Sequence, residues 1–219
     1  MNSGQPVNAG QPVHPGQPEK SDSRGTTARW AVLSAGAAPL VLVGGWTVAQ
    51  WRQPARYNPV RDTISALAAH GATDRWIMTL ALAGLGACHV VTALGLRPAR
   101  CTGPLVFAGG GIATVMVAAF AQPARGNSLS HTVAATVAFT ALATWPALAW
   151  RRQPSPPLLS ARASVAASVV LVGLVLWFAA ELHGGDRGLA ERTAAGAQAL
   201  WPLAVVVSSR RARHRVEPG

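Results

Sequence analysis

Six long runs without Lys, Arg, Asp or Glu dominate the chain. They lie between Arg29 and Arg52, Arg75 and Arg97, Arg100 and Arg125, Arg125 and Arg151, Arg162 and Glu181, and Arg192 and Arg210. A helix needs roughly 20 apolar residues to cross a hydrocarbon core of about 30 Å. The pattern therefore predicts an all-α, polytopic membrane bundle of six transmembrane helices at approximately 30–50, 76–96, 103–122, 130–150, 163–182 and 192–208.

The segments outside these runs predict the rest of the organisation. Residues 1–28 repeat Gly-Gln-Pro and hold almost nothing apolar, so we expect a disordered tail. Residues 29–209 form the predicted membrane domain, and 210–219 form a short basic tail. Most loops are short, and short loops make consecutive helices antiparallel neighbours. We therefore expect up-down topology.

The distribution of charged residues among the loops predicts how the bundle is oriented in the membrane. Only 12% of the residues are charged, against about 25% in an ordinary soluble domain. With the N-terminus inside, the inner segments hold 12 basic and three acidic residues, whereas the outer loops hold seven basic and five acidic ones. Basic residues concentrate on cytoplasmic loops. We therefore expect both termini in the cytoplasm and a plasma-membrane location. We expect the partners of the basic residues, with their net charge of +11, to be membrane lipids and not nucleic acid.

The composition, with 18 Arg to one Lys, is typical of a bacterial, GC-rich genome.

The first outer loop, 51–75, differs from the other loops because it carries its own helix pattern. Asp62 suits the N-cap position, and Gly71 suits the left-handed residue that closes a helix. Between them, Ile64 and its neighbours Leu67 and Ala68 share one face. An isolated helix of this length is unstable in water, so we expect a two-turn interfacial helix over 62–70, docked on the outer mouth of the bundle. Thr73 or Asp74 is then expected to cap the second span.

Three pieces of sequence resemble the domain-of-unknown-function family 998, a group of multi-span prokaryotic membrane proteins. They are NPVRDTISALAA in the first loop, SLSHTVAATVAF around His131, and GLAERTAAGAQALW at 188–201. The resemblance covers roughly residues 30–208. It implies the fold and residence in a membrane, and it implies no reaction. The family often carries an acidic residue after the Ser of the first piece, where this chain has Ala66.

The outer side also collects the polar side chains that are candidates for chemistry. The candidate catalytic residues are Asp62, Ser65, His131, Glu191 and Arg192, and the candidate metal ligands are His70, His131, His183 and Glu181. Ionisable groups near a membrane interface must be paired, hydrated or functional. We expect Glu191 or Arg192 to pair with Arg61 or Asp62 across the bundle mouth.

These residues leave three functions open. The first is binding of a lipid or small amphiphile in an outward-facing pocket at headgroup level. The second is a membrane-embedded hydrolase, metal-dependent or with a Ser-His-Asp relay, acting on a lipid or envelope substrate. The third is a structural protein without a ligand. No HExxH, GxSxG or CxxC motif occurs, so we favour a non-enzymatic role. The sequence assigns no cofactor and no oligomeric state.

His89 stands apart because it lies deep within the second predicted span, where Gln198 of the sixth span is the other strongly polar residue. An intramembrane His relays protons, holds a ligand, or bonds to a neighbouring helix. We expect the last of these.

Overall fold

The computed structural model describes residues 28–96, 99–152 and 156–214, and within them it contains helices and no strand. The six long helices are α1 (Arg29–Trp51), α3 (Trp76–Gly95), α4 (Thr102–Ala119), α5 (Leu129–Ala149), α6 (Ala161–Ala180) and α7 (Arg187–His214). Three short elements join them: α2 (Ile64–Leu67) and the 3-10 turns η2 (Pro157–Leu159) and η3 (Glu181–His183). Each predicted span falls largely within one long helix.

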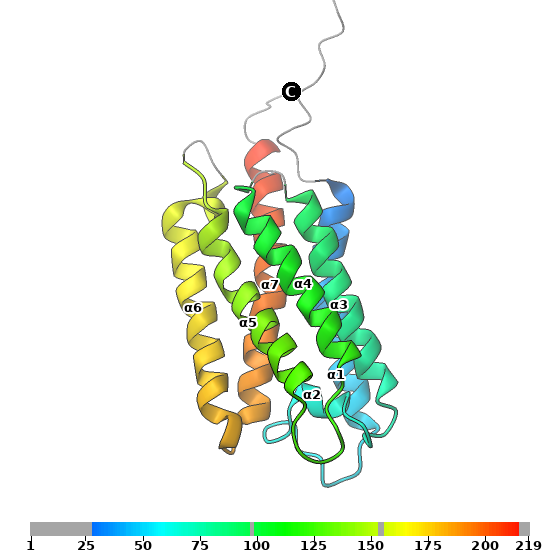
Figure 1. Cartoon of the computed structure of the whole chain (residues 1–219). Coiled ribbons are helices and arrows are strands. Elements are labelled where there is room, and N and C mark those ends of the chain that lie inside the picture. Colours follow the sequence, from blue (N-terminus) through cyan, green and yellow to red (C-terminus); the bar gives the residue numbers. More distant parts are fainter. Residues whose placement is uncertain (1–27, 97–98, 153–155, 215–219) are drawn as a thin grey trace, which may run out of the picture.

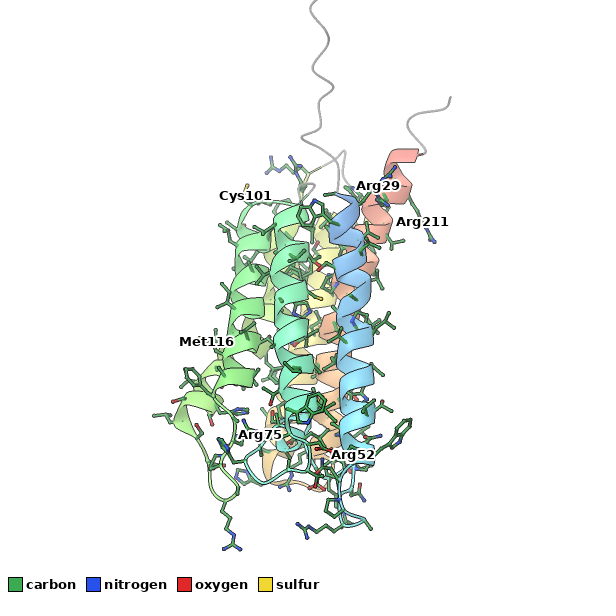
Figure 2. The ribbon with its side chains drawn as sticks, turned by 90° about the vertical axis from the view of Figure 1, so that its right-hand side faces the viewer. Arg29, Arg52, Arg75, Cys101, Met116 and Arg211 are labelled. Carbon is green, nitrogen blue, oxygen red and sulfur yellow. The ribbon has the colours of Figure 1, made fainter. Side chains whose placement is uncertain are left out.

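The long helices form a single bundle in which consecutive helices pack side by side (Figure 1). The ring closes because α7 packs against both α6 and α1. Arg29 and Arg211 lie at one end of the bundle, whereas Arg52 and Arg75 lie at the other (Figure 2). The two described ends of the chain are therefore on the same side of the molecule.

Five of the long helices, all except α7, are long and apolar enough to cross a membrane. Their outward surfaces expose large apolar side chains such as Leu33, Leu105 and Val169, each more than half exposed. The described chain is thus a helical bundle of membrane type. The sixth predicted span, 192–208, lies in α7, whose apolar run is diluted by Gln198, Pro202 and the flanking arginines.

Small residues bring the helix backbones together, as lipid-embedded helices require. Gly86 of α3 and Gly111 of α4 face each other so closely that a Cβ on Gly86 would lie 2.5 Å from the Gly111 carbonyl oxygen. Away from this crossing the core is filled by larger groups, including the stacked rings of Phe107 and Trp145, 4.7 Å apart.

Both predicted tails fall largely outside the described residues. Only Ala28 of the tail 1–28 is described, and so are residues 210–214 of the predicted basic tail. Those five residues are helical, because α7 continues to His214. The predicted basic tail is therefore helical over its first five residues.

The loop between α1 and α3 corrects two details of the predicted capping. Thr63, not Asp62, is the N-cap of α2, because its hydroxyl accepts the Ala66 N–H at 3.1 Å. The Asp62 carboxylate instead accepts the Asn58 N–H at 2.8 Å. Neither Thr73 nor Asp74 caps α3, since the Asp74 carboxylate is paired with Arg52 at 2.8 Å.

The helix in this loop is also shorter than predicted, with four residues in place of two turns. The series of helical hydrogen bonds ends before His70. The His70 N–H instead donates to the carbonyl of Gln122, in the loop between α4 and α5, at 2.8 Å. Gly71 has the predicted left-handed backbone, with φ of 96°. The apolar face is docked as expected, because Ile64, Leu67 and Ala68 are all buried.

Candidate functional site

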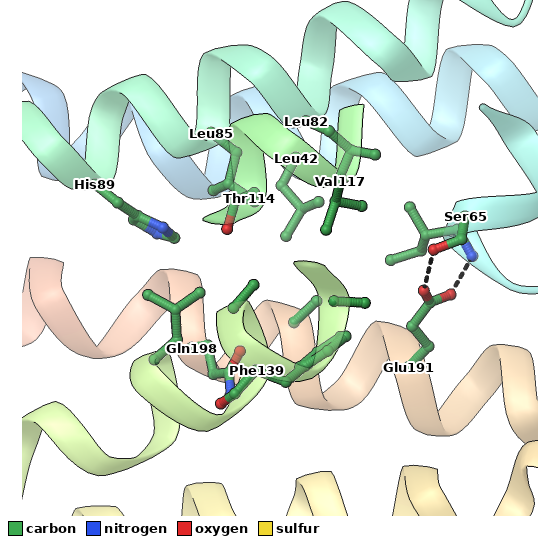
Figure 3. Close-up of a pocket in the computed structure, with 15 residues that line it drawn as sticks. Leu42, Ser65, Leu82, Leu85, His89, Thr114, Val117, Phe139, Glu191 and Gln198 are labelled. Atoms are coloured by element: carbon green, nitrogen blue, oxygen red, sulfur yellow. Dashed lines mark hydrogen bonds between the residues drawn. The ribbon is translucent and has the colours of Figure 1, made fainter. Parts of the chain in front are cut away.

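Glu191 joins the first turns of α7 to the loop between α1 and α3. Its carboxylate accepts the Ile64 N–H and, at 2.9 Å, the Ser65 hydroxyl (Figure 3). The side chain is buried, with only 3% of the residue exposed. A buried carboxylate is tolerated when hydrogen bonds replace its hydration, and α2 presents both donors at the start of its single turn. Ser65 and Glu191 are thus one unit, although 126 positions separate them.

Arg192, the next residue of α7, holds the same loop. Its guanidinium donates to the carbonyls of Pro59 at 2.7 Å and Asp62 at 2.8 Å. A further bond goes to the hydroxyl of Tyr57 at 2.5 Å, and the group lies 5.9 Å from the ring centre of Trp46. The predicted partner, Asp62, is therefore reached through its backbone carbonyl. Its carboxylate lies 4.0 Å from Arg187 instead.

Tyr57 is partly buried where the loop meets Arg192. Burial raises the pKa of the Tyr57 phenol above its usual value of 10, and this effect exceeds the lowering influence of the nearby Arg192 charge. The phenol therefore stays neutral over the physiological range, so it can accept from Arg192 while donating to the Asp62 carbonyl at 3.4 Å.

Gly188 allows the loop and α7 to touch backbone to backbone. A Cβ at this position would meet the carbonyl oxygens of Asp62 and of Pro59, the latter at 2.6 Å. The neighbouring Leu189 N–H donates to the Val60 carbonyl at 3.0 Å. The first and third resembling sequence pieces, NPVRDTIS and GLAER, are therefore the two halves of one contact.

A cleft opens beneath this contact, between α5, α6 and the start of α7. About 250 Å³ of it is open to water-sized molecules. Its polar lining includes side chains from the loops and α7 at the outer end and a threonine row along α5: Thr63, Ser65, Gln122, His131, Thr132, Thr136, Thr140 and Glu191. The remaining lining is apolar and comes from α5, α6 and η3: Ala135, Phe139, Val175, Phe178, Ala179 and Leu182. The cleft is thus polar at its mouth, and its walls combine the threonine row of α5 with apolar side chains.

His131 is the buried imidazole of this cleft. Ser128 caps α5 by accepting the His131 N–H at 3.3 Å, which places the ring one turn below the mouth. The ring Nδ1–H donates to the Phe120 carbonyl at 2.9 Å. The neutral imidazole then keeps Nε2 as an acceptor. His131, Ser65 and Glu191 line the same space, so the structure brings together three of the candidate catalytic residues.

The remaining candidates lie elsewhere. His70 contacts Arg75 at 3.0 Å and lines a separate outer basin together with Asp62. Glu181 and His183 belong to η3, where the Glu181 carboxylate accepts the Asp186 N–H at 3.2 Å. Within the described ranges no three His, Cys, Asp or Glu side chains are grouped as a metal site would need. The candidate metal ligands are therefore dispersed.

The hydrogen bonds of Ser65 and His131 differ from those of a hydrolytic Ser-His-Asp relay. In such a relay the serine hydroxyl bonds to an imidazole, which a carboxylate orients. Here the Ser65 hydroxyl donates to the Glu191 carboxylate, and the His131 ring bonds to a backbone carbonyl. The Ser65 hydroxyl and the His131 Nδ1–H are therefore bonded to other groups, and no Ser65–His131 hydrogen bond is formed among the described residues.

Sequence reasoning missed several residues of this site. Tyr57 and Gly188 were not singled out, although Tyr57 is the only tyrosine of the chain. Thr132, Thr136 and Thr140 recur every four positions, which places them on one face of a helix. That spacing was the signal that could have identified the wall of the cleft.

Comparison with known proteins gives one match. The model of a family described as "Protein of unknown function (DUF998)" matches residues 21–208. No curated protein and no solved structure is detectably similar to the chain.

Proposed function

Since the chain belongs to DUF998, a family of unknown function, we propose its role from its own geometry: it binds a lipid or small amphiphile in the cleft between α5, α6 and the start of α7. The observation that carries this proposal is the division of the cleft into a polar mouth, with Ser65, His131 and Glu191, and apolar side walls from Phe139 and Phe178. A molecule with a hydrogen-bonding head and a hydrocarbon tail matches both parts.

We place the cleft in the outer leaflet of a bacterial plasma membrane. This placement takes all six long helices as spans, with both termini in the cytoplasm. α7 has 28 residues, about 42 Å at about 1.5 Å per residue, so it is long enough to cross. Its Gln198 faces the protein, being 2% exposed and donating to the Phe139 carbonyl at 2.9 Å. The excess of Arg at the Arg29–Arg211 end supports assigning that end to the cytoplasm.

The charged groups that line the cleft indicate which kind of headgroup the bound amphiphile carries. Glu191 is the only acidic side chain among the described residues that line the cleft, and no Lys or Arg is among them. An anionic phosphate would find no cation there, whereas a hydroxyl or an amine would meet acceptors from Glu191 and His131. We therefore propose a neutral or amine-bearing amphiphile.

Access from the membrane is supported by the weak packing of α6. Among the five apolar helices, α6 has the smallest buried share. Val169, Val170 and Leu176 on its surface are more than 60% exposed. A tail can therefore reach the apolar walls of the cleft from the surrounding lipid.

The experiment is lipid analysis of protein purified in a mild detergent. We expect a neutral or amine-bearing amphiphile to be retained by the wild-type protein and lost from Ala135→Phe, which fills the cleft. Val137→Phe on the half-exposed surface of the same helix is the matched control and should retain it. Equal amphiphile content in all three proteins, or none in the wild type, would contradict the proposal. Cleavage of the retained amphiphile on incubation would favour the hydrolase instead.

A further inference from the structure

A second, narrower cavity runs inward from the Ser65–Glu191 contact to His89. It lies between α1, α3, α4, α5 and α7, and Figure 3 shows His89 at one end and the Ser65–Glu191 pair at the other. It shares four lining residues with the cleft: Ser65, Ala135, Phe139 and Glu191. About 50 Å³ is open to water-sized molecules, enough for roughly three waters, since one needs about 10–15 Å³.

His89 is the unexplained group in this cavity. The residue is 1% exposed, and within the described chain neither ring nitrogen has a hydrogen-bond partner. The sequence-based expectation that it bonds to a neighbouring helix is therefore not met by any described residue. Its one close ring contact is with Phe107, whose centre lies 5.1 Å away and which supplies no acceptor.

An imidazole always carries at least one N–H donor, and when neutral it carries one acceptor as well. Leaving both unpaired inside a protein is unfavourable, and buried polar groups of this kind are usually satisfied by ordered water. The cavity beside His89 also offers polar partners to such water, because Thr114 and Gln198 belong to its lining.

We propose that the inner cavity is a hydrated site in which water binds the ring nitrogens of His89. The water lies in the middle of the bundle, in a cavity whose lining is otherwise mainly apolar. Glu191, at the far end of the same cavity, is the only other titratable side chain among the described lining residues. The proposal is independent of whether an amphiphile occupies the neighbouring cleft.

Hydroxyl-radical footprinting by synchrotron X-rays, with mass spectrometric detection, tests this on the full chain in lipid nanodiscs. Radicals form from water, so a buried side chain is oxidised when water is bound beside it. The internal reference is Met78, which is completely buried, does not line the cavity, and is intrinsically more reactive than histidine. We expect His89 to be oxidised at least tenfold faster than Met78. A His89 rate no higher than that of Met78 would overturn the proposal.

Two variants then locate the water. Ala138→Leu and Ala195→Val each place extra methyl groups in the cavity lining, so each should lower His89 oxidation severalfold. Val137→Leu, on the half-exposed surface of α5, is the matched control and should leave the rate unchanged. If Ala138→Leu fails to fold, Ala195→Val still tests the proposal. His89 oxidation that is the same in the wild type and in every folded filling variant would also overturn the proposal.

Discussion

The carboxylate of Glu191 holds the hydroxyl of Ser65 at 2.9 Å, and so it ties the last long helix to the loop that follows the first one. The adjacent Arg192 grips the same loop through two backbone carbonyls and Tyr57. Two consecutive residues therefore fix the loop between α1 and α3 on α7. The same carboxylate lines both the cleft and the inner cavity. Glu191 therefore fixes the loop and also belongs to both proposed sites.

Removing the Glu191 carboxylate should destabilise the protein strongly. Glu191→Ala leaves the Ile64 N–H and the Ser65 hydroxyl buried without an acceptor, at a cost of about 3 kcal/mol. Glu191→Gln keeps one acceptor oxygen and should lose less. Thermal unfolding in detergent measures both, with Arg125→Ala in an exposed loop as the control. A Glu191→Ala midpoint equal to that of the control would mean that the contact is not formed.

Gly188→Ala should also be destabilising, against the usual trend. Alanine ordinarily stabilises a helix relative to glycine by about 1 kcal/mol. At this position the new Cβ would press on the Pro59 and Asp62 carbonyls, so the loop has to move away from α7. Gly173→Ala, in α6 with nothing within 4 Å of its Cβ, is the matched control and should be neutral or stabilising. The same unfolding assay compares them, and stabilisation by both changes would refute the close approach.

Tyr57 should titrate above its ordinary pKa of 10 in the folded protein. Because the folded-state pKa is raised, the contribution of the neutral phenol to stability is complete below about pH 10 and is lost as the pH rises through the raised value. Tyr57 is the only tyrosine, so tyrosinate absorbance at about 295 nm reports it alone, with Tyr57→Phe as the blank. A midpoint at or below 10 in folded protein would show that the phenol is not buried against the loop.

Cysteine labelling should distinguish the docked part of the loop from its exposed part. In a background lacking Cys88 and Cys101, a cysteine at Ile64 should resist a membrane-impermeant thiol reagent, because Ile64 is 2% exposed. A cysteine at Thr73, which is exposed, should react. Equal labelling at both positions would show a loop that is free of the bundle.

The runs without charged residues predicted the helices well. Placing a charged side chain in hydrocarbon costs free energy, so the charged residues determine where a span can lie. The sequence predicted the ends of helices less well. Asp62 was expected to cap α2, but its carboxylate accepts from Asn58, and the cap is the next residue, Thr63. The sequence contains a suitable side chain at both positions, and the fold of the loop decides between them.

The candidate site was predictable only as a set of polar residues on one side. Glu191, Ser65 and His131 were named from sequence and do line one cleft. Their pairing was not predictable, since Ser65 and Glu191 are brought together by the packing of α7 against α1 and the loop. Similarly, no local pattern shows that His89 lies beside a cavity.

The most direct measurement of the central claim is a cross-link between Val60→Cys and Leu189→Cys with a short bifunctional thiol reagent, in the background lacking Cys88 and Cys101. The two residues are 40% and 44% exposed, and the Leu189 N–H donates to the Val60 carbonyl at 3.0 Å. The account predicts a linked pair of peptides in the mass spectrum of membranes treated with the reagent, and no link for the control pair Thr73→Cys with Leu189→Cys. Absence of the Val60–Leu189 link, or equal linking in both pairs, would contradict a loop that is fixed on the last helix above the cleft.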